Sequence, residues 1–207
     1  MKDSNPSSGK KSQVSARKLR EEQRARAAQR RRLIFIAIGA LVVIAIGALI
    51  YSIATAPPPK QIEGVELFPN IAGGQHIEGA INYPQTPPVG GPHNNAWQNC
   101  GVYDTAIRNE NAVHSMEHGA VWVTYSPDLP ADQIKQLQDM LRGQSYILLS
   151  PYAGLPAPVV ASAWSAQLKL QSAGDPRLSQ FVTQYRLGPY APERNASCQG
   201  GVGTPIG

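Results

Sequence analysis

The sequence has no charged side chain in the 24 residues from Leu33 to Ala56. At a rise of about 1.5 Å per residue, a helix of this length reaches roughly 36 Å and can cross a hydrocarbon core of about 30 Å. This length argues against the core helix of a soluble domain. The absence of charge therefore predicts a transmembrane helix over residues 33–56.

The signatures of several protein classes are also missing. The Gly-rich stretch 200–203 lacks the Lys and Ser/Thr that follow a phosphate-binding loop. Ser150 and Ser162 have no base at a recognisable spacing, and the sequence has no internal repeat. Aromatic residues are few, so we expect buried core or turn positions for Trp97, Trp122 and Trp164.

Charge is divided unevenly along the chain. Residues 1–32 contain 11 Lys/Arg and 3 Asp/Glu, whereas residues 33–207 contain 8 and 11, so the formal charge of +5 divides into +8 and −3. Basic residues directly before a span stay on the cytoplasmic side. We therefore predict a cytoplasmic N-terminus and an extracytoplasmic C-terminal part. The anionic inner leaflet and the orientation of the span already explain why residues 1–32 are basic, so we expect no nucleic-acid partner.

A cleaved signal peptide is the rival interpretation of the N-terminus. Its apolar region would have about 7 to 15 residues and would end at a small-residue cleavage site. The run in this sequence is longer, and Pro57 stands where cleavage would occur. We therefore expect an uncleaved anchor in the cell membrane.

The composition divides the rest of the chain into four parts. Residues 1–15 are polar and Ser-rich, which predicts disorder, and residues 16–32 are strong helix formers that continue into the span. Three consecutive prolines indicate a stiff spacer over residues 57–62. Residues 63–207 have an ordinary size for one extracytoplasmic domain.

Pro and Gly occur every few residues up to about Asn109, so the first third of this domain is predicted to be rich in loops. Regular elements follow it. Strands are predicted at 120–125, 146–149 and 159–164, the last continuing toward 170, and helices at 130–141 and from Asp175-Pro176 to Gly188-Pro189. Strands and helices interleaved in this way predict an α+β domain, with a small α/β domain as the alternative.

The only two cysteines are Cys100 and Cys198, and both follow the span. Thiols on the oxidising side of the membrane tend to pair. We predict a disulfide that ties the middle of the domain to its Gly-rich C-terminal tail, with free thiols or metal ligands as the alternatives.

The densest cluster of candidate metal ligands is His-Ser-Met-Glu-His at residues 114–118. In a helix, His114 and His118 share a face with Glu117 beside them, and these nitrogen and oxygen donors suit zinc, iron or manganese. In a strand, Met116 instead aligns with the two histidines, and two imidazoles with a thioether suit copper. The backbone conformation thus decides the donor set.

We favour a short helix, because Gly119 can cap it before the following strand. Met116 then becomes a core contact and is not a ligand. The alternative interpretation is that two histidines four residues apart only donate hydrogen bonds to carbonyl or carboxylate groups.

The remaining histidines, His76 and His93, both lie in Gly-rich turns upstream of this cluster. Residues 87–92, directly before His93, are rich in Pro and Gly, so this segment is stiff and has no large side chains that would keep His93 away from a site. We expect these turns to bring His76 and His93 to the paired histidines, with solvated loop positions as the alternative.

Residues 114–118 also match the H-x-x-E-H pattern of inverted zinc peptidases, in which both histidines bind zinc and Glu117 would activate water. Those enzymes have larger domains and need a further acidic ligand, for which only Glu193 stands far enough downstream. A zinc-dependent hydrolase therefore remains an alternative.

Five stretches of the domain look familiar together: residues 87–93, 100–104, 113–121, 149–152 and 161–164, of which the paired-histidine stretch is the most specific. Through them most of the domain, roughly residues 63–205, resembles a bacterial family catalogued as domain of unknown function 3105. The resemblance implies a single N-terminal span followed by one such domain. The family usually has leucine where this chain has Met116, which favours a helix with that side chain in the core.

Together these observations predict a single-pass membrane protein whose external α+β domain binds a transition metal through His114, His118, His93 and His76. Copper is the first choice and zinc the second, because copper has the highest affinity among the divalent ions. The domain would hold or deliver metal near membrane enzymes. The alternative from a different class is a metal-free accessory subunit of a membrane protein complex.

Overall fold

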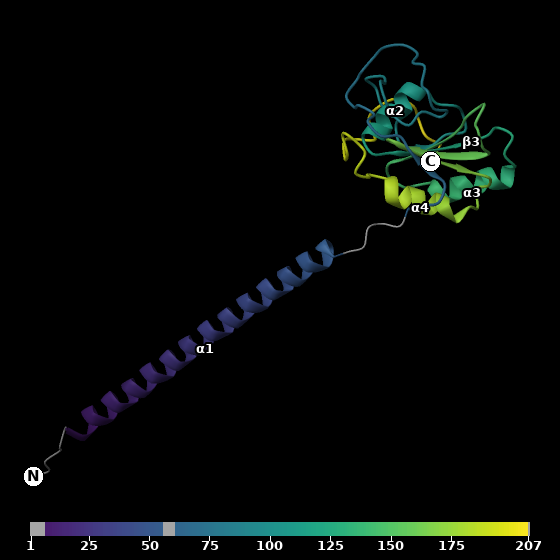
Figure 1. Ribbon diagram of the computed structural model, residues 1–207. Helices are drawn as coiled ribbons and strands as arrows, with labels where there is room; N and C mark the ends of the chain where they lie inside the picture. Colours follow the sequence, from purple (N-terminus) through teal and green to yellow (C-terminus); the bar gives the residue numbers. More distant parts are fainter. Residues whose placement is uncertain (1–6, 56–60, 207) are drawn as a thin grey trace, which may run out of the picture. The chain divides into compact units, whose positions relative to one another are not determined.

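The computed structural model describes residues 7–55 and 61–206 (Figure 1). The chain divides into two compact units between Pro59 and Lys60. Each unit is described by itself.

Among the described residues 7–55, the first unit contains one helix, α1 (Ser7–Ala54). Its segment Gln29–Ala54 is long and apolar enough to cross a membrane, and an 18-residue window within it has a mean hydropathy of 3.1 and no buried residue. The prediction of disorder for residues 1–15 was wrong for residues 7–15, which are helical. Extending an existing helix by one residue costs less free energy than nucleating a new helix. The helix formed by the strong helix formers downstream therefore extends into these polar residues. Residues 1–6 and the prolines at 57–59 lie outside the described residues.

The second unit has the predicted α+β class. Within residues 61–206, six strands form one mixed sheet in which β3 and β4 are parallel, β4 and β2 are parallel, and the other pairs are antiparallel. The strands of this sheet have the following spatial order and bounds: β1 (Val65–Leu67), β6 (Ala166–Leu170), β5 (Val159–Ala163), β3 (Val121–Tyr125), β4 (Ile147–Pro151) and β2 (Gly101–Val102). The parallel pairs β3–β4 and β4–β2 thus lie together at one edge of the sheet.

Two predicted helices are confirmed within one to three residues at their ends. α3 (Ala131–Leu141) follows Pro130 and connects the parallel strands β3 and β4. α4 (Pro176–Tyr185) begins as predicted, because the Asp175 side chain accepts a hydrogen bond from the backbone N–H of Arg177 and proline occupies the first turn.

The strand predicted from residue 159 toward 170 is a β-hairpin. β5 and β6 pair with each other, and Ala163 lies opposite Ala166. Ser165 turns the chain with a φ of 63°. The two-residue connection carries no Gly or Asn, so the sequence gives no turn signal there. The strands β1 and β2 were not predicted, since two or three residues are too few for a periodicity.

Both faces of the sheet are covered. Along β3, the side chains of Val121, Val123 and Tyr125 join one hydrophobic cluster with α3 and α4, whereas Trp122 joins a second cluster with Met116 of α2 (Asn109–Glu117). Figure 1 shows α3 and α4 on one side of the sheet, and α2 with the long loops on the other. Helices and loops on both faces explain why β3 is apolar at successive positions.

The predicted disulfide is confirmed. Cys100 and Cys198 are bonded, with their Cα atoms 5.4 Å apart, and both are buried. The backbone N–H of Cys100 also donates to the carbonyl of Cys198 over 2.8 Å. The disulfide therefore fixes the C-terminal tail beside β2 and the second hydrophobic cluster.

We expect the Cys100→Ser Cys198→Ser variant to lose about 2–5 kcal/mol of unfolding free energy, because it frees a loop that spans a sequence separation of 98 residues. All three tryptophans lie after residue 60, so tryptophan fluorescence in a denaturant titration reports this unit even in the detergent-solubilised full chain. The wild-type protein treated with dithiothreitol is the control and should match the variant. An unchanged midpoint would contradict a stabilising role of the disulfide.

Candidate metal centre

Helix α2 is the element that builds the candidate site. All its residues from Glu110 to Glu117 are buried, because the sheet lies on one side and loops cover the other. Gly119, with a φ of 106°, donates its N–H to the carbonyl of Met116 over 3.0 Å and ends the helix. A side chain at position 119 would lie 2.8 Å from Leu187, so both the conformation and the packing require glycine. The predicted helix at the paired histidines is thus confirmed.

The helical conformation decides which side chains share a face. His114 and Glu117 are three residues apart and point to the same side of α2, whereas Met116 is fully buried in the second hydrophobic cluster. The donor set of two imidazoles with a thioether, which an extended backbone would give, is therefore absent from α2.

Two loops carry His76 and His93 to this face. The backbone N–H of His93 donates to the carbonyl of Gln75 over 2.9 Å, and the N–H of Ile77 donates to the carbonyl of His93 over 2.8 Å. These bonds form an isolated parallel bridge between His76 and His93. The ring centroids of His76 and His114 lie 4.9 Å apart, and those of His93 and His114 lie 4.8 Å apart.

Four side chains converge on one point. His76, His93, His114 and Glu117 each offer one ligand atom, and these atoms all lie within 4.8 Å of one another. His93, His114 and Glu117 are buried, and His76 is exposed. Three imidazoles and one carboxylate form a donor set that can hold a transition-metal ion.

Hydrogen bonds orient two of the buried rings. Nδ1 of His93 donates to the carbonyl of Gly91 over 2.8 Å, and Nδ1 of His114 donates to the carbonyl of Asn94 over 2.7 Å. A carbonyl oxygen can only accept, so the proton is on Nδ1 and the lone pair of a neutral ring is on Nε2. Histidines that bind metals are commonly fixed in this way.

The Glu117 carboxylate is shared between two neighbours. Its Oε1 accepts from the backbone N–H of Gly74 over 2.5 Å, and its Oε2 lies 2.9 Å from Nε2 of His93. Both side chains are fully buried, and neither Oε2 nor Nε2 has a hydrogen-bond partner of suitable geometry in the described parts of the chain. Two acceptors this close repel each other unless a proton on Nε2 or a metal ion lies between them.

Burial and neighbouring groups shift the pKa of three members of the site, and not all in the same direction. Burial and the neighbouring histidines outweigh the Asn94 carbonyl and lower the pKa of His114 to about 4, so its ring is neutral at pH 7. Burial raises the pKa of Glu117, but the neighbouring His93 and the hydrogen bond from the Gly74 N–H lower it by more. The pKa of Glu117 therefore lies below its ordinary value. Burial lowers the pKa of His93, whereas contacts with Glu117 and Gly91 raise it above its ordinary value.

His118 lies beside this group and is not one of its four members. Its Nδ1 contacts the carbonyl of Ser197 at 2.5 Å, and its Nε2 lies 3.7 Å from the carboxylate of Glu193. The structure thus gathers three of the four predicted histidines with Glu117. The H-x-x-E-H pattern assigns different roles, because it requires His118 as a ligand and Glu117 as a free base.

Sequence reasoning missed the glycines and the tryptophan that shape the site. A side chain on Gly73 would lie 2.6 Å from Oε1 of Glu117, so glycine is needed for the loop to approach the carboxylate. The ring of Trp97 lies 5.6 Å from that of His114 and 5.2 Å from that of His118. The Gly-rich turn before His76 predicts that this histidine approaches the cluster, but it does not predict the contacts of Gly73 and Gly74 with Glu117.

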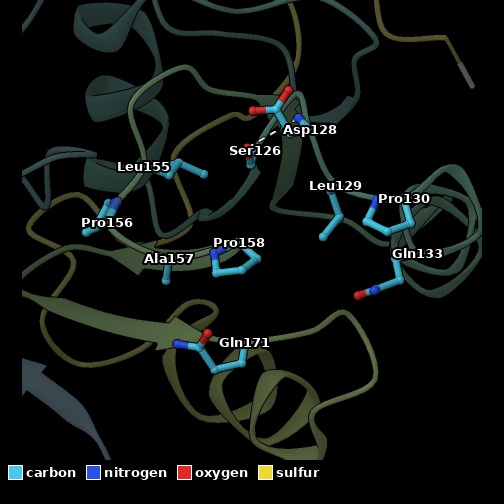
Figure 2. A pocket seen from close by; sticks show the side chains of 10 residues that line it. All are labelled: Ser126, Asp128, Leu129, Pro130, Gln133, Leu155, Pro156, Ala157, Pro158 and Gln171. Carbon is cyan, nitrogen blue, oxygen red and sulfur yellow. Dashed lines mark hydrogen bonds between the residues drawn. The ribbon is translucent and has the colours of Figure 1, made fainter.

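Two cavities elsewhere among residues 61–206 offer no comparable donor set. One cavity of about 420 Å³ lies between the segment after β3 and the segment before β5 (Figure 2). Its lining includes one carboxylate, Asp128, and neither histidine nor cysteine. A second cavity, of about 540 Å³, is mostly apolar and is lined by parts of the two loops that carry His76 and His93. The histidine cluster is therefore the candidate site.

Comparison with curated proteins and with solved structures finds no match to the chain. A family model does match it, over residues 76–200. This range includes all four members of the cluster and both cysteines. The chain therefore belongs to the family described as "Protein of unknown function (DUF3105)".

Proposed function

We propose that the domain binds one divalent transition-metal ion through His76, His93, His114 and Glu117. The observation that carries this proposal is the pair of buried acceptors, Nε2 of His93 and Oε2 of Glu117, which face each other at 2.9 Å. A proton between these two acceptors would remove their repulsion, but it would leave the imidazoles of His76 and His114 without a role. A metal ion would remove the repulsion and would also bind those two imidazoles.

The donor types narrow the choice of metal. No thiolate or thioether belongs to the group, since the cysteines form a disulfide and Met116 packs in the core. Copper is the first candidate, because Cu²⁺ has the highest affinity of the divalent series for nitrogen and oxygen donors. Zinc is the second, because four nitrogen and oxygen ligands match its tetrahedral preference.

The role we propose is to hold or deliver this ion close to membrane enzymes. Glu117 is engaged with the Gly74 N–H and faces His93, so it is not free to activate water. The geometry therefore favours metal binding over the hydrolase alternative. A metal-free accessory subunit of a membrane complex is the outcome if no ion is retained.

We also propose that α1 crosses the cell membrane with its N-terminus in the cytoplasm. The 11 Lys/Arg of residues 1–32 support this orientation, because basic residues next to a span remain inside. The disulfide supports it too, since disulfides persist in oxidising compartments. The metal-binding domain would then be extracytoplasmic.

The metal proposal is tested by stripping the detergent-solubilised full chain with a chelator and dialysing it against limiting Cu²⁺ or Zn²⁺. We expect the wild type to retain about one equivalent by elemental analysis, because the cluster forms one site. His114→Ala should lose it. The matched control is His118→Ala, one turn along α2, which should retain it. A wild type without metal would contradict the proposal.

A Glu117→Gln variant separates a ligand from a general base. We expect the affinity for the ion to fall by at least about 10-fold, because the variant loses a charged donor, while metal-free stability stays within about 1 kcal/mol. The new amide can donate to the unpaired Nε2 of His93. Competition with a chelator measures the affinity, and denaturant unfolding measures the stability. Unchanged binding with loss of peptide or ester turnover would instead favour the hydrolase.

The orientation is tested with single cysteines introduced on either side of the span. In intact cells, a membrane-impermeant maleimide should label the exposed position of Ala80→Cys and leave Arg24→Cys unlabelled, because only the domain faces outward. Both should react in permeabilised cells, which is the control. The reverse pattern in intact cells would contradict the proposed orientation.

A further inference from the structure

His76 differs from the other members of the cluster in its exposure to solvent. His93 and Glu117 are 0% exposed and His114 is 4% exposed, whereas His76 is exposed to solvent. Its neighbours Gln75 and Ile77 are exposed as well. An ion held by the cluster would therefore contact solvent on the His76 side.

His76 is also the member whose side chain is held least. Nδ1 of His93 and Nδ1 of His114 bind backbone carbonyls, and Glu117 accepts from the Gly74 N–H. Within residues 61–206, no hydrogen bond fixes the His76 ring. The backbone on either side of it is paired with His93, so its Cα stays in place while its ring can turn.

These two differences decide which bond to an ion breaks most readily. Moving His93 or His114 away from the centre requires a buried hydrogen bond to break and core packing to open. Rotating the ring of His76 into solvent requires neither. The side chain can turn on a short timescale without local unfolding.

We propose that His76 is the exchange ligand of this site, and that transfer of the ion begins when an exposed imidazole of a second protein takes the place of the His76 ring. The ion is then shared between the two proteins, and it leaves when further donors of the second protein replace His93, His114 and Glu117. This inference rests on the proposed function and adds the chemistry of the partner to it. The bond between the ion and one ring nitrogen of His76 breaks, and a bond to the incoming neutral imidazole nitrogen forms. The oxidation state of the ion and the charge of the site do not change.

An imidazole fits this step for two reasons. It has the shape and donor type of the ring that it replaces, so the remaining three ligands keep their positions. A neutral donor also preserves the charge balance between the ion and the single carboxylate Glu117, which the buried position makes important. A thiolate would add a second negative charge beside a buried carboxylate.

The experiment uses the detergent-solubilised full chain loaded with the ion that the wild type retains. Release into an excess of a chromogenic chelator is followed by stopped-flow absorbance. We expect His76→Ala to bind about one equivalent at saturating metal and to release it at least about 10-fold faster than the wild type, because three buried ligands remain. Free imidazole should slow release from this variant by filling the vacated place.

Two control variants accompany the measurement, one expected to behave like the wild type and one expected to lose the ion. Gln75→Ala changes the exposed neighbour and keeps the backbone carbonyl that binds His93, so it should release at the wild-type rate. His93→Ala should fail to bind at saturating metal. Tryptophan fluorescence confirms that each variant is folded.

The possible outcomes separate this inference from the function on which it rests. If His76→Ala binds no ion while the wild type does, His76 is a holding ligand and the inference is wrong. If it releases at the wild-type rate, or if imidazole does not slow release, exchange at His76 by an imidazole is wrong as well. If the wild type itself retains no ion, the metal-binding function fails first.

Discussion

The arrangement of this domain depends on one buried pair, Nε2 of His93 and Oε2 of Glu117, at 2.9 Å. Each atom is an acceptor in the neutral-ring form, because Nδ1 of His93 already carries the proton that binds Gly91. Placing two such atoms together in a core is unfavourable without a cation. The surrounding loops nevertheless hold both groups firmly, with Gly74 on the carboxylate and a backbone carbonyl on the ring. The fold thus maintains a site whose stability depends on what it binds.

The C-terminal tail connects this pair to the rest of the domain. The backbone N–H of Glu193 donates to the carbonyl of Glu117, and that of Asn195 donates to the carbonyl of His118, so the tail satisfies the last carbonyls of α2. Further along, the disulfide at Cys198 anchors the same tail to Cys100 beside β2. A helix of nine residues would be marginal alone, and the tail fixes its C-terminal end here.

Local sequence patterns predicted the parts of the site that depend on local structure. The spacing of His114 and Glu117 on a helix follows from 3.6 residues per turn, and Gly119 marked the end of that helix. The position of His76 beside His93 rests on backbone hydrogen bonds between distant loops, which leave no periodicity in the sequence. The same reason hid the short strand β2, whose two residues are defined by pairing with β4. Ser165 closed a hairpin without a recognisable turn residue, so β5 and β6 were predicted as one strand.

The position of Trp97 has an optical consequence. Its indole ring lies 5.6 Å from the ring of His114, while its Nε1 is buried without a hydrogen-bond partner among residues 61–206. An emitter so close to the coordination centre would lose intensity to a paramagnetic ion such as Cu²⁺ and keep it beside closed-shell Zn²⁺. The chain would therefore carry its own luminescent probe of which ion the cluster holds, if the proposed binding is correct.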